Sequence, residues 1–380
     1  MAYDFDNMVG RRNTGSLKWD KYAGREIIPM WVADMDFRCP PVVREALHHR
    51  IDHGVFGYSI ATKELVQVIV DRMATKYRWS IDPSWIVWLP GLVPGINIAC
   101  RCMGGDGDEA VCFVPAYPPF LTVPEQNDWN LITVPLSRRD GRSYMDPERF
   151  KAALTPRTKL FILCHPHNPV GREFTPDELR PIVEICRERN ILVCSDEIHC
   201  DLVLDDIDHV PTATLSDDVA QNTITLLAPS KTFNIPGLNC GLAIIPNDSL
   251  RRKYALDANR MLPDCNALGY VAAQAAYQNG EPWRRELIKY LRQNRNLVFD
   301  YINHRIPFLS MDHVEATYLA WIKTSELNVP NAAEFFERAG VGLSDGKFFM
   351  GDGFVRLNFG CSRQTLVEGL ERMKRAVENI

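Results

Sequence analysis

The chain has 380 residues, of which 46% are hydrophobic, and a formal net charge of -5 at pH 7. This is enough apolar material for a large core of roughly two to three structural units. Charged residues of both signs are interspersed, so the charge pattern gives no sign of a nucleic-acid partner. No apolar stretch is long enough to cross a bilayer, and the acidic start lacks the apolar core of a secretory signal. We therefore expect a cytoplasmic protein that acts on a small molecule and has no membrane or nucleic-acid partner.

The first part of the chain, residues 1–45, is rich in Gly, Pro, Trp and charge and has no clear periodicity. We expect it to form an extended arm. Residues 46–282 are expected to form a large domain, and residues 283–380 a smaller one. The eleven cysteines are scattered, and the closest pair, Cys100 and Cys102, suits neither a zinc site nor a redox motif. We expect reduced, mostly buried thiols.

Short apolar runs rich in β-branched residues alternate with helical segments between residues 110 and 246, which is typical of a buried, mainly parallel sheet. The expected strands are Val111–Val114, Leu160–Cys164, Ile191–Ser195, Thr223–Leu227 and Gly241–Ile245. The segment that begins at Thr175 combines an N-cap, a first-turn proline and the capping-box residue Glu178, and therefore predicts the start of a helix.

The pattern changes after Pro282. A long polar helix is expected from Trp283 to about His304, followed by a short strand pair near Tyr318–Lys323, a further helix and a strand at Phe354–Asn358. This order predicts a smaller α+β domain.

The polar residues that follow the expected strands are the main candidates for chemistry, because ligands of such sheets gather at the carboxyl ends of the strands. Lys231 follows one strand. A buried lysine with a lowered pKa can capture an aldehyde cofactor as an imine. Asp196 follows another strand and is the candidate for holding a pyridine nitrogen protonated. Asn168 and Tyr117 are placed to contact the phenolic oxygen and the face of the ring.

Each of these residues also has an ordinary structural explanation. Lys231 alone would be a surface lysine, Asp196 a cap and Asn168 a turn residue before a proline. Tyr117 would be a packing aromatic. The charge of Arg356, inside an apolar strand, needs a partner, which a structural ion pair would also provide.

The ordered set of motifs is more specific than any member. It comprises Tyr117, Asn168-Pro169-x-Gly171, Asp196-Glu197, Ser230-Lys231 and Arg356. With this set the chain resembles the fold type I pyridoxal-phosphate (PLP) enzymes of the aspartate aminotransferase superfamily. The resemblance implies an α/β fold with a mainly parallel seven-stranded sheet in the large domain, a smaller α+β C-terminal domain, and pyridoxal 5'-phosphate bound to Lys231.

Two regions resemble more closely the cystathionine β-lyase or C-S lyase subgroup of the MalY/PatB type. One is the arm motif Pro29-Met30-Trp31-Val32-Ala33-Asp34-Met35-Asp36-Phe37. The other runs from Ser195 to Leu202 and places His199 where most aminotransferases of the superfamily have a tyrosine. A buried, hydrogen-bonded histidine without a role in the site is the alternative for His199.

The resemblance also implies roles at both ends of the ligand. Leu92 and Val93 supply backbone amides to the cofactor phosphate, Ser230 supplies a hydroxyl, and Tyr58 reaches across from a second subunit, so a homodimer with shared sites is expected. Arg356 binds the α-carboxylate of an amino acid substrate, because a guanidinium donates two parallel hydrogen bonds. Ala33 lies near the substrate.

Two positions depart from the superfamily pattern. Asn239 stands where many aminotransferases have a phosphate-binding arginine, and Ala228 where a serine is common. Which groups replace them is not determined by the sequence. No metal site is expected, because the pairs His48-His49 and His165/His167 lack further ligands nearby in the sequence.

The function implied by the subgroup is cleavage of cystathionine or related S-substituted cysteines to a thiol, pyruvate and ammonia, with Lys231 as the base and Lys231 or Tyr117 as the proton donor to the thiolate. An aminotransferase on the same scaffold is the first alternative. A noncatalytic regulatory protein with the same fold is the second, and the retained Lys231 disfavours it.

Overall fold

The computed structural model describes residues 3–380 and contains a large seven-stranded sheet with the strand order β2-β10-β9-β8-β7-β3-β4. Neighbouring strands are parallel except for β10, which is antiparallel to both β9 and β2. The strands are β2 (Ile86–Leu89), β3 (Glu109–Val114), β4 (Asn130–Pro135), β7 (Thr158–Cys164), β8 (Leu192–Asp196), β9 (Thr223–Leu227) and β10 (Gly241–Ile244). The mainly parallel sheet and all five expected strands are confirmed.

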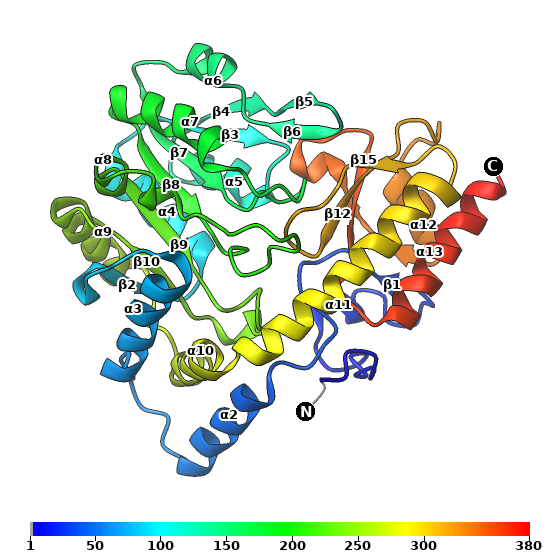
Figure 1. The fold of residues 1–380 in the computed structure, drawn as a ribbon, viewed down its shortest axis with the longest axis horizontal. Helices are drawn as coiled ribbons and strands as arrows, with labels where there is room; N and C mark the ends of the chain where they lie inside the picture. The colour runs from blue at the N-terminus through cyan, green and yellow to red at the C-terminus, as the bar shows by residue number, and fades with distance from the viewer. Residues whose placement is uncertain (1–2) are drawn as a thin grey trace.

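Helices cover both faces of this sheet, which buries its strands on each side (Figure 1). One core cluster joins the sheet to α4 (Leu92–Met103), α5 (Pro118–Gln126) and α9 (Asp248–Met261). A second joins it to α6 (Pro147–Ala153), α7 (Pro176–Glu188) and α8 (Asp217–Gln221). A third cluster packs α3 (Lys63–Tyr77) and α10 (Ala267–Asn279) against β10.

Helix α7 begins where the sequence predicts. The Thr175 hydroxyl accepts from the Glu178 amide at 3.3 Å, and the Glu178 carboxylate accepts from the Thr175 amide at 2.8 Å. This reciprocal capping box satisfies two backbone groups that a helix start leaves without partners.

The C-terminal part contains an antiparallel four-stranded sheet in the order β11-β12-β15-β14. Its elements are α11 (Glu281–Asp300), a π-helical turn (Tyr301–Arg305), β11 (Ser310–Met311), β12 (Leu319–Lys323), α12 (Ala332–Arg338), β13 (Val341–Gly342), β14 (Ser344–Asp345), β15 (Phe354–Asn358) and α13 (Arg363–Glu378). The strand at Phe354–Asn358 is confirmed. The expected short strand pair near Tyr318–Lys323 is also confirmed, as the antiparallel pair of β11 with β12.

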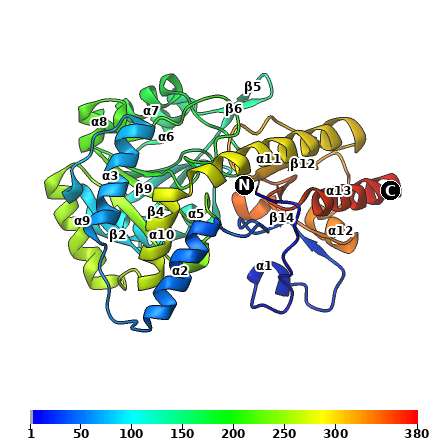
Figure 2. The ribbon, with the colours of Figure 1, turned by 60° about the horizontal axis from the view of Figure 1, so that its bottom comes forward.

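The N-terminal segment is more structured than the extended arm that the sequence suggested. It contains α1 (Leu17–Asp20) and β1 (Ile28–Pro29), which pairs in parallel with β13, and α2 (Pro41–His53) already begins at Pro41. Figure 2 shows α1 beside the part of the molecule that holds α12 and α13. The division of the chain at residues 45 and 282 stays a prediction.

Ion pairs help to fix the course of this segment, together with buried apolar side chains such as Met30 and Met35. Arg11 contacts Asp34 and Asp36 at 2.7 Å each, and the buried Lys18 contacts Asp36 at 2.9 Å. Because these partners lie far along the chain, local periodicity could not reveal them.

The remaining regular elements are short. They are the hairpin β5 (Ser137–Arg139) and β6 (Arg142–Tyr144), and 3-10 turns at Pro83–Trp85, Thr212–Thr214, Pro236–Leu238 and Gly346–Phe349. Over residues 3–380, no helix has the length and apolar character that a membrane crossing requires.

Candidate active site

The candidate residues gather at the carboxyl ends of the parallel strands. Asp196 ends β8, Asn168 follows β7, Tyr117 follows β3 and Lys231 follows β9. Arg356 reaches the same place from β15, where its Nη1 donates to Asn168 Oδ1 at 3.1 Å. The strand ends and the C-terminal sheet therefore form one site.

The amine of Lys231 is held by the arm. Its Nζ donates to the carbonyl oxygen of Ala33 at 2.6 Å, and the Tyr318 hydroxyl donates to the same oxygen at 2.9 Å. Burial, together with the positive charge of Arg356, lowers the pKa of Lys231 to about 8. A larger fraction of this amine is therefore neutral at physiological pH than in an exposed lysine, as a nucleophile or base requires.

Asp196 is a buried carboxyl group whose side chain accepts a hydrogen bond from the Ile198 amide at 3.1 Å. Burial raises its pKa to about 7, against the opposing effects of the Ile198 amide and Lys231. A cationic group placed against this carboxylate would be strongly favoured, because it would supply the charge partner that burial makes necessary.

Arg356 is a buried guanidinium without an acidic partner among residues 3–380. Its Nη2 donates to the Trp31 carbonyl oxygen at 2.9 Å, and its Nε has no hydrogen-bond partner in the described chain. Burial lowers its pKa to about 10. The structural ion pair that was the alternative explanation for Arg356 is therefore absent from the described residues, and an anionic ligand could complete its coordination.

His199 is buried beside the same charges. Burial, with further contributions from Lys231 and Arg356, lowers its pKa to about 3, so its ring is neutral. Its Nδ1 has no partner among residues 3–380, and the ring meets the edge of Tyr318 at a centroid distance of 6.2 Å. A neutral imidazole with an unused ring nitrogen can form one more hydrogen bond with a ligand.

Tyr117 is half-buried and caps the start of α5, with its ring against Phe120 at 6.0 Å. Burial and the nearby charge of Asp196 raise the pKa of its hydroxyl, which therefore keeps its proton at neutral pH.

The groups expected to bind a phosphate lie at a second edge of the site. Leu92 and Val93 form the first turn of α4, where free backbone amides point outward, and Ser230 precedes Lys231. Asn239 is exposed and has a left-handed backbone conformation (φ 49°), and Ala228 is buried.

Tyr58 lies away from its own chain's site, in the loop between α2 and α3, with a fully exposed side chain. A role for it therefore requires a second subunit, and the role stays a prediction.

The sequence model of the aminotransferase class I and II family matches residues 25–373 of the chain. This protein belongs to the aminotransferase class I and II family. The match covers the seven-stranded and the four-stranded sheet and every candidate site residue described above.

Individual members of this family are similar over the full length of the chain. Cystathionine beta-lyase PatB of Bacillus subtilis (strain 168) is 38% identical, over 98% of this chain and 100% of PatB. The solved structure of OvoB is 44% identical with a TM-score of 0.96, over 99% of each chain. Cystalysin of Treponema denticola, solved with pyridoxal 5'-phosphate, is 32% identical with a TM-score of 0.96, over 100% of each chain. The expected MalY/PatB-type resemblance is confirmed.

The site of this family member fits pyridoxal phosphate. The cofactor needs an amine, a buried carboxylate for its ring nitrogen and amides for its phosphate, and the chain provides Lys231, Asp196 and the first turn of α4. The unused Nδ1 of buried His199 supports the same fit, because a buried polar atom without a partner is costly unless a ligand satisfies it.

A cavity of about 450 Å³ adjoins this site and reaches Tyr117 and Arg356. Trp31 and Val32 of the arm line it on one side, and Phe348 and Phe349 line it on another. Its size is that of a typical small-molecule pocket. Lys231 does not line it, so the cavity extends outward from Arg356 rather than surrounding the amine.

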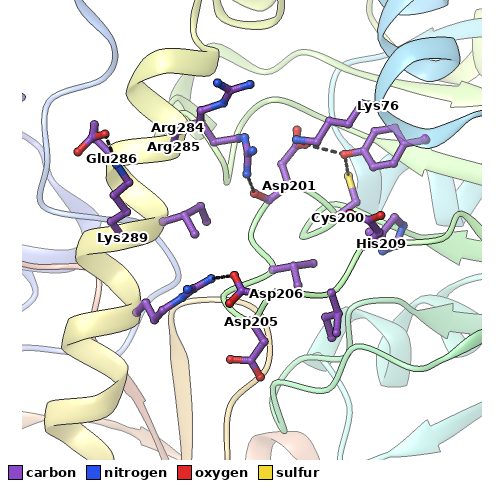
Figure 3. A pocket seen from close by; sticks show the side chains of 16 residues that line it. Lys76, Cys200, Asp201, Asp205, Asp206, His209, Arg284, Arg285, Glu286 and Lys289 are labelled. Carbon is purple, nitrogen blue, oxygen red and sulfur yellow. Dashed lines mark hydrogen bonds and ion pairs between the residues drawn. The ribbon is translucent and has the colours of Figure 1, made fainter.

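A larger cavity of about 710 Å³ lies elsewhere, between α11 and residues 200–209 (Figure 3). Several of its charged side chains are paired with one another, as in the contacts of Lys76 with Asp201, Arg292 with Asp206 and Lys289 with Glu286. None of the candidate cofactor or substrate residues lines it, so we assign the chemistry to the smaller cavity.

Three site residues had no assigned role in the sequence analysis. Tyr318 shares the Ala33 carbonyl with Lys231, and Trp31 provides the carbonyl that holds Arg356. The Asn234 side chain accepts from the Met35 amide and donates to the carbonyls of Met35 and Phe37, which fixes the arm against the lysine loop. Trp31 stands within the arm motif Pro29–Phe37 and Asn234 lies three residues after Lys231, whereas Tyr318 carries no sequence signal.

Proposed function

We propose that this chain is a PLP-dependent C-S β-lyase that cleaves cystathionine or related S-substituted cysteines. One observation indicates an amino acid substrate. The site contains both an amine of lowered pKa, Lys231, and the buried guanidinium of Arg356, which has no acidic partner among the described residues. The choice of lyase chemistry is supported by full-length relatives such as cystathionine beta-lyase PatB.

The overall reaction breaks the Cα–H, Cβ–S and Cα–N bonds of the substrate and consumes one water, whose oxygen becomes the keto oxygen of pyruvate. An S-substituted cysteine and water give a thiol, pyruvate and ammonium, and the proton removed from Cα balances the proton gained by the departing sulfur. Pyridoxal phosphate supplies the electron sink that makes the α-proton acidic.

The chain's own residues divide the remaining work. Arg356 binds the α-carboxylate through two parallel hydrogen bonds and thereby fixes the position of Cα. The Lys231 amine removes the α-proton as a general base, for which a pKa near 8 is suitable. Asp196, whose ionised form a cationic ring nitrogen would stabilise, would hold that nitrogen in its protonated state.

The departing thiolate needs a proton donor. Tyr117 keeps its proton at neutral pH because burial raises its pKa, and the Lys231 amine carries a proton once it has acted as the base. Either group can therefore protonate the sulfur, and water then hydrolyses the released aminoacrylic acid to pyruvate and ammonium.

We further propose a homodimer with shared sites, in a reducing cytoplasmic compartment. The loop that carries Tyr58 supports the first part, because it also exposes Val55, Phe56 and Ile60. The cysteines support the second, because all eleven are free.

The decisive experiment supplies L-cystathionine to the purified holoenzyme without any keto acid and follows pyruvate, ammonia and thiol. We expect catalytic release of all three in equal amounts. Turnover that requires an added keto acid and yields an amino acid product would contradict the lyase and favour an aminotransferase.

A lysine variant tests the assignment of the base. Lys231→Ala should lose the visible imine absorbance and at least about 1000-fold in kcat, because both the imine and the general base depend on this amine. The matched control is Lys289→Ala, an exposed lysine whose ammonium is paired with Glu286, and it should keep both. An active Lys231→Ala enzyme that retains the imine band would remove Lys231 from the mechanism.

A further inference from the structure

The cavity beside Arg356 has an aromatic lining. The cavity is lined by the aromatic residues Trp31, Tyr117, Phe348 and Phe349 and by the aliphatic residues Val32 and Leu343. Arg356 and Tyr117 are its only lining residues with an assigned role toward substrate or cofactor. A substituent on an amino acid held by Arg356 therefore has the aromatic walls as its immediate surroundings.

Two of these aromatic side chains, Trp31 and Phe349, are held in place by contacts within the protein. The Trp31 indole donates from Nε1 to the Lys18 carbonyl at 3.1 Å, and its backbone carbonyl accepts from Ser344 as well as Arg356. Phe349 lies under the Arg356 guanidinium at 4.5 Å and is buried. Side chains that are already ordered lose little conformational entropy when a ligand binds to them.

Phe348 is a different kind of wall, because 69% of its side chain is exposed although it lines the cavity. Phe348 belongs to the turn Gly346–Phe349. This turn is anchored by the hydrogen bond that the Ala116 amide donates to the Phe349 carbonyl at 3.0 Å. An anchored and exposed aromatic ring at a cavity can gain contact area when an apolar ligand covers it.

The charges of the cavity exclude one class of ligand. Glu334, Glu337 and Asp345 line it, and apart from Arg356 its one cation is Lys21. The Lys21 ammonium is already placed over the Trp31 ring at 4.5 Å and the Tyr22 ring at 4.9 Å. Glu337 is paired with Arg25 at 2.9 Å and Glu334 with Arg338 at 3.6 Å, so an additional carboxylate at this end would face acidic groups that already have cationic partners, the carboxylate of Asp345 and a cation with other contacts, which is unfavourable.

We propose that this cavity is the subsite for the sulfur substituent, and that it selects S-aryl, S-benzyl and similar bulky apolar substituents without a carboxylate. The inference rests on the proposed β-lyase function and narrows its substrate class. A hydrogen substituent, as in L-cysteine, leaves the aromatic walls without a partner, and the second carboxylate of L-cystathionine meets the acidic side chains.

The test compares kcat/KM of the holoenzyme for S-benzyl-L-cysteine, L-cystathionine and L-cysteine, with pyruvate release as the common measurement. We expect S-benzyl-L-cysteine to exceed each of the other two by at least about ten-fold, which is the range that an apolar pocket provides. A higher value for L-cystathionine or L-cysteine would overturn the proposed selectivity. Failure of all three to give pyruvate would instead contradict the lyase function.

Two variants connect the selectivity to the cavity. Phe348→Ala should lower the preference for S-benzyl-L-cysteine over L-cystathionine by about three- to ten-fold, because it removes one aromatic wall. Glu334→Lys should shift the same ratio toward L-cystathionine, because it replaces a repulsive charge with an attractive one.

The matched control is Phe308→Ala, which removes another exposed phenylalanine (55% of its side chain) that does not line the cavity. Its ratio of the two kcat/KM values should equal that of the unmodified enzyme. An unchanged ratio in both Phe348→Ala and Glu334→Lys would place the sulfur substituent elsewhere.

Discussion

Lys231 and Arg356 bring two cationic groups into the same buried region, and this arrangement couples substrate binding to basicity. Burial is the largest cause of the lowered pKa of Lys231, and the charge of Arg356 is the next. In the proposed mechanism a substrate carboxylate neutralises Arg356, so the repulsion that lowers this pKa weakens when substrate is present. The Lys231 amine is then a stronger base at the step that requires one.

His209 is another buried cation, in a network that includes Glu197, the residue next to Asp196. Its Nδ1 lies 2.9 Å from Glu173 Oε1 and its Nε2 lies 3.0 Å from Glu197 Oε2, and all three side chains are buried. Burial opposes the charge, yet the two carboxylates raise the pKa of His209 to about 10. His165 also contacts Glu173, at 3.2 Å, but burial lowers its pKa, so the charge of the network resides on His209.

The raised pKa of His209 makes stability depend on pH. In the unfolded chain histidine has a pKa near about 6.5, so the contribution of His209 is complete below that pH and is lost as pH rises through about 10. His209 by itself lowers the unfolding free energy by up to about 1.4 kcal/mol per pH unit within this window, and above about pH 8 the lowered pKa of Lys231 opposes this fall, so the prediction concerns the difference in slope between the unmodified protein and the variant. His209→Gln should be about 3–5 kcal/mol less stable at pH 7 and should lack this slope.

Urea unfolding of the unmodified protein and of His209→Gln between pH 6.5 and 10 measures both effects. The control is His313→Gln, which removes a half-exposed histidine that contacts Asp205 at 2.7 Å and should keep the slope. Equal slopes in the unmodified protein and His209→Gln would mean that His209 is not the titrating group.

At the scale of elements, the capping box of α7 is a local device whose strength can be measured. Thr175→Ala removes the hydroxyl that accepts from the Glu178 amide, while Glu178 keeps its contacts with Arg172. Loss of an N-cap of this kind costs about 1 kcal/mol, so the urea midpoint should fall accordingly. Thr122→Ala, within α5, should change stability by less than about 0.5 kcal/mol. Equal losses in the two variants would contradict the capping role.

Such local devices explain which elements the sequence predicts well. The strand at Thr223–Leu227 is a short apolar run between turn residues, and α7 has its own start signal, so both depend on neighbouring residues alone. The arm depends instead on Arg11 and Lys18 finding Asp34 and Asp36, and β1 depends on β13 far along the chain. Local patterns contain no information about such partners, so the short elements of the arm were not predicted.

The same distinction applies to the site. Asp196, Asn168 and Lys231 could be chosen from the sequence because each follows a predictable strand, and parallel strands bring their carboxyl ends together. His209 and Tyr318 could not, because their importance depends on contacts with Glu173, Glu197 and Ala33 that only the folded chain creates.

At the scale of the whole molecule, the proposed shared site can be tested by mixing two inactive chains. If Tyr58 of one subunit serves the Lys231 site of the other, a hybrid of Lys231→Ala and Tyr58→Ala chains contains one site with both residues intact. Random reassembly makes half of the dimers hybrid, so the mixture should regain about a quarter of the unmodified activity. The lyase assay after co-refolding measures this recovery.

The control mixes Lys231→Ala with Asp196→Ala, two residues that this structure brings together within one chain, and should regain none. Recovery in the control, or its absence in the Tyr58 mixture, would mean that the two subunits do not share their sites in this way.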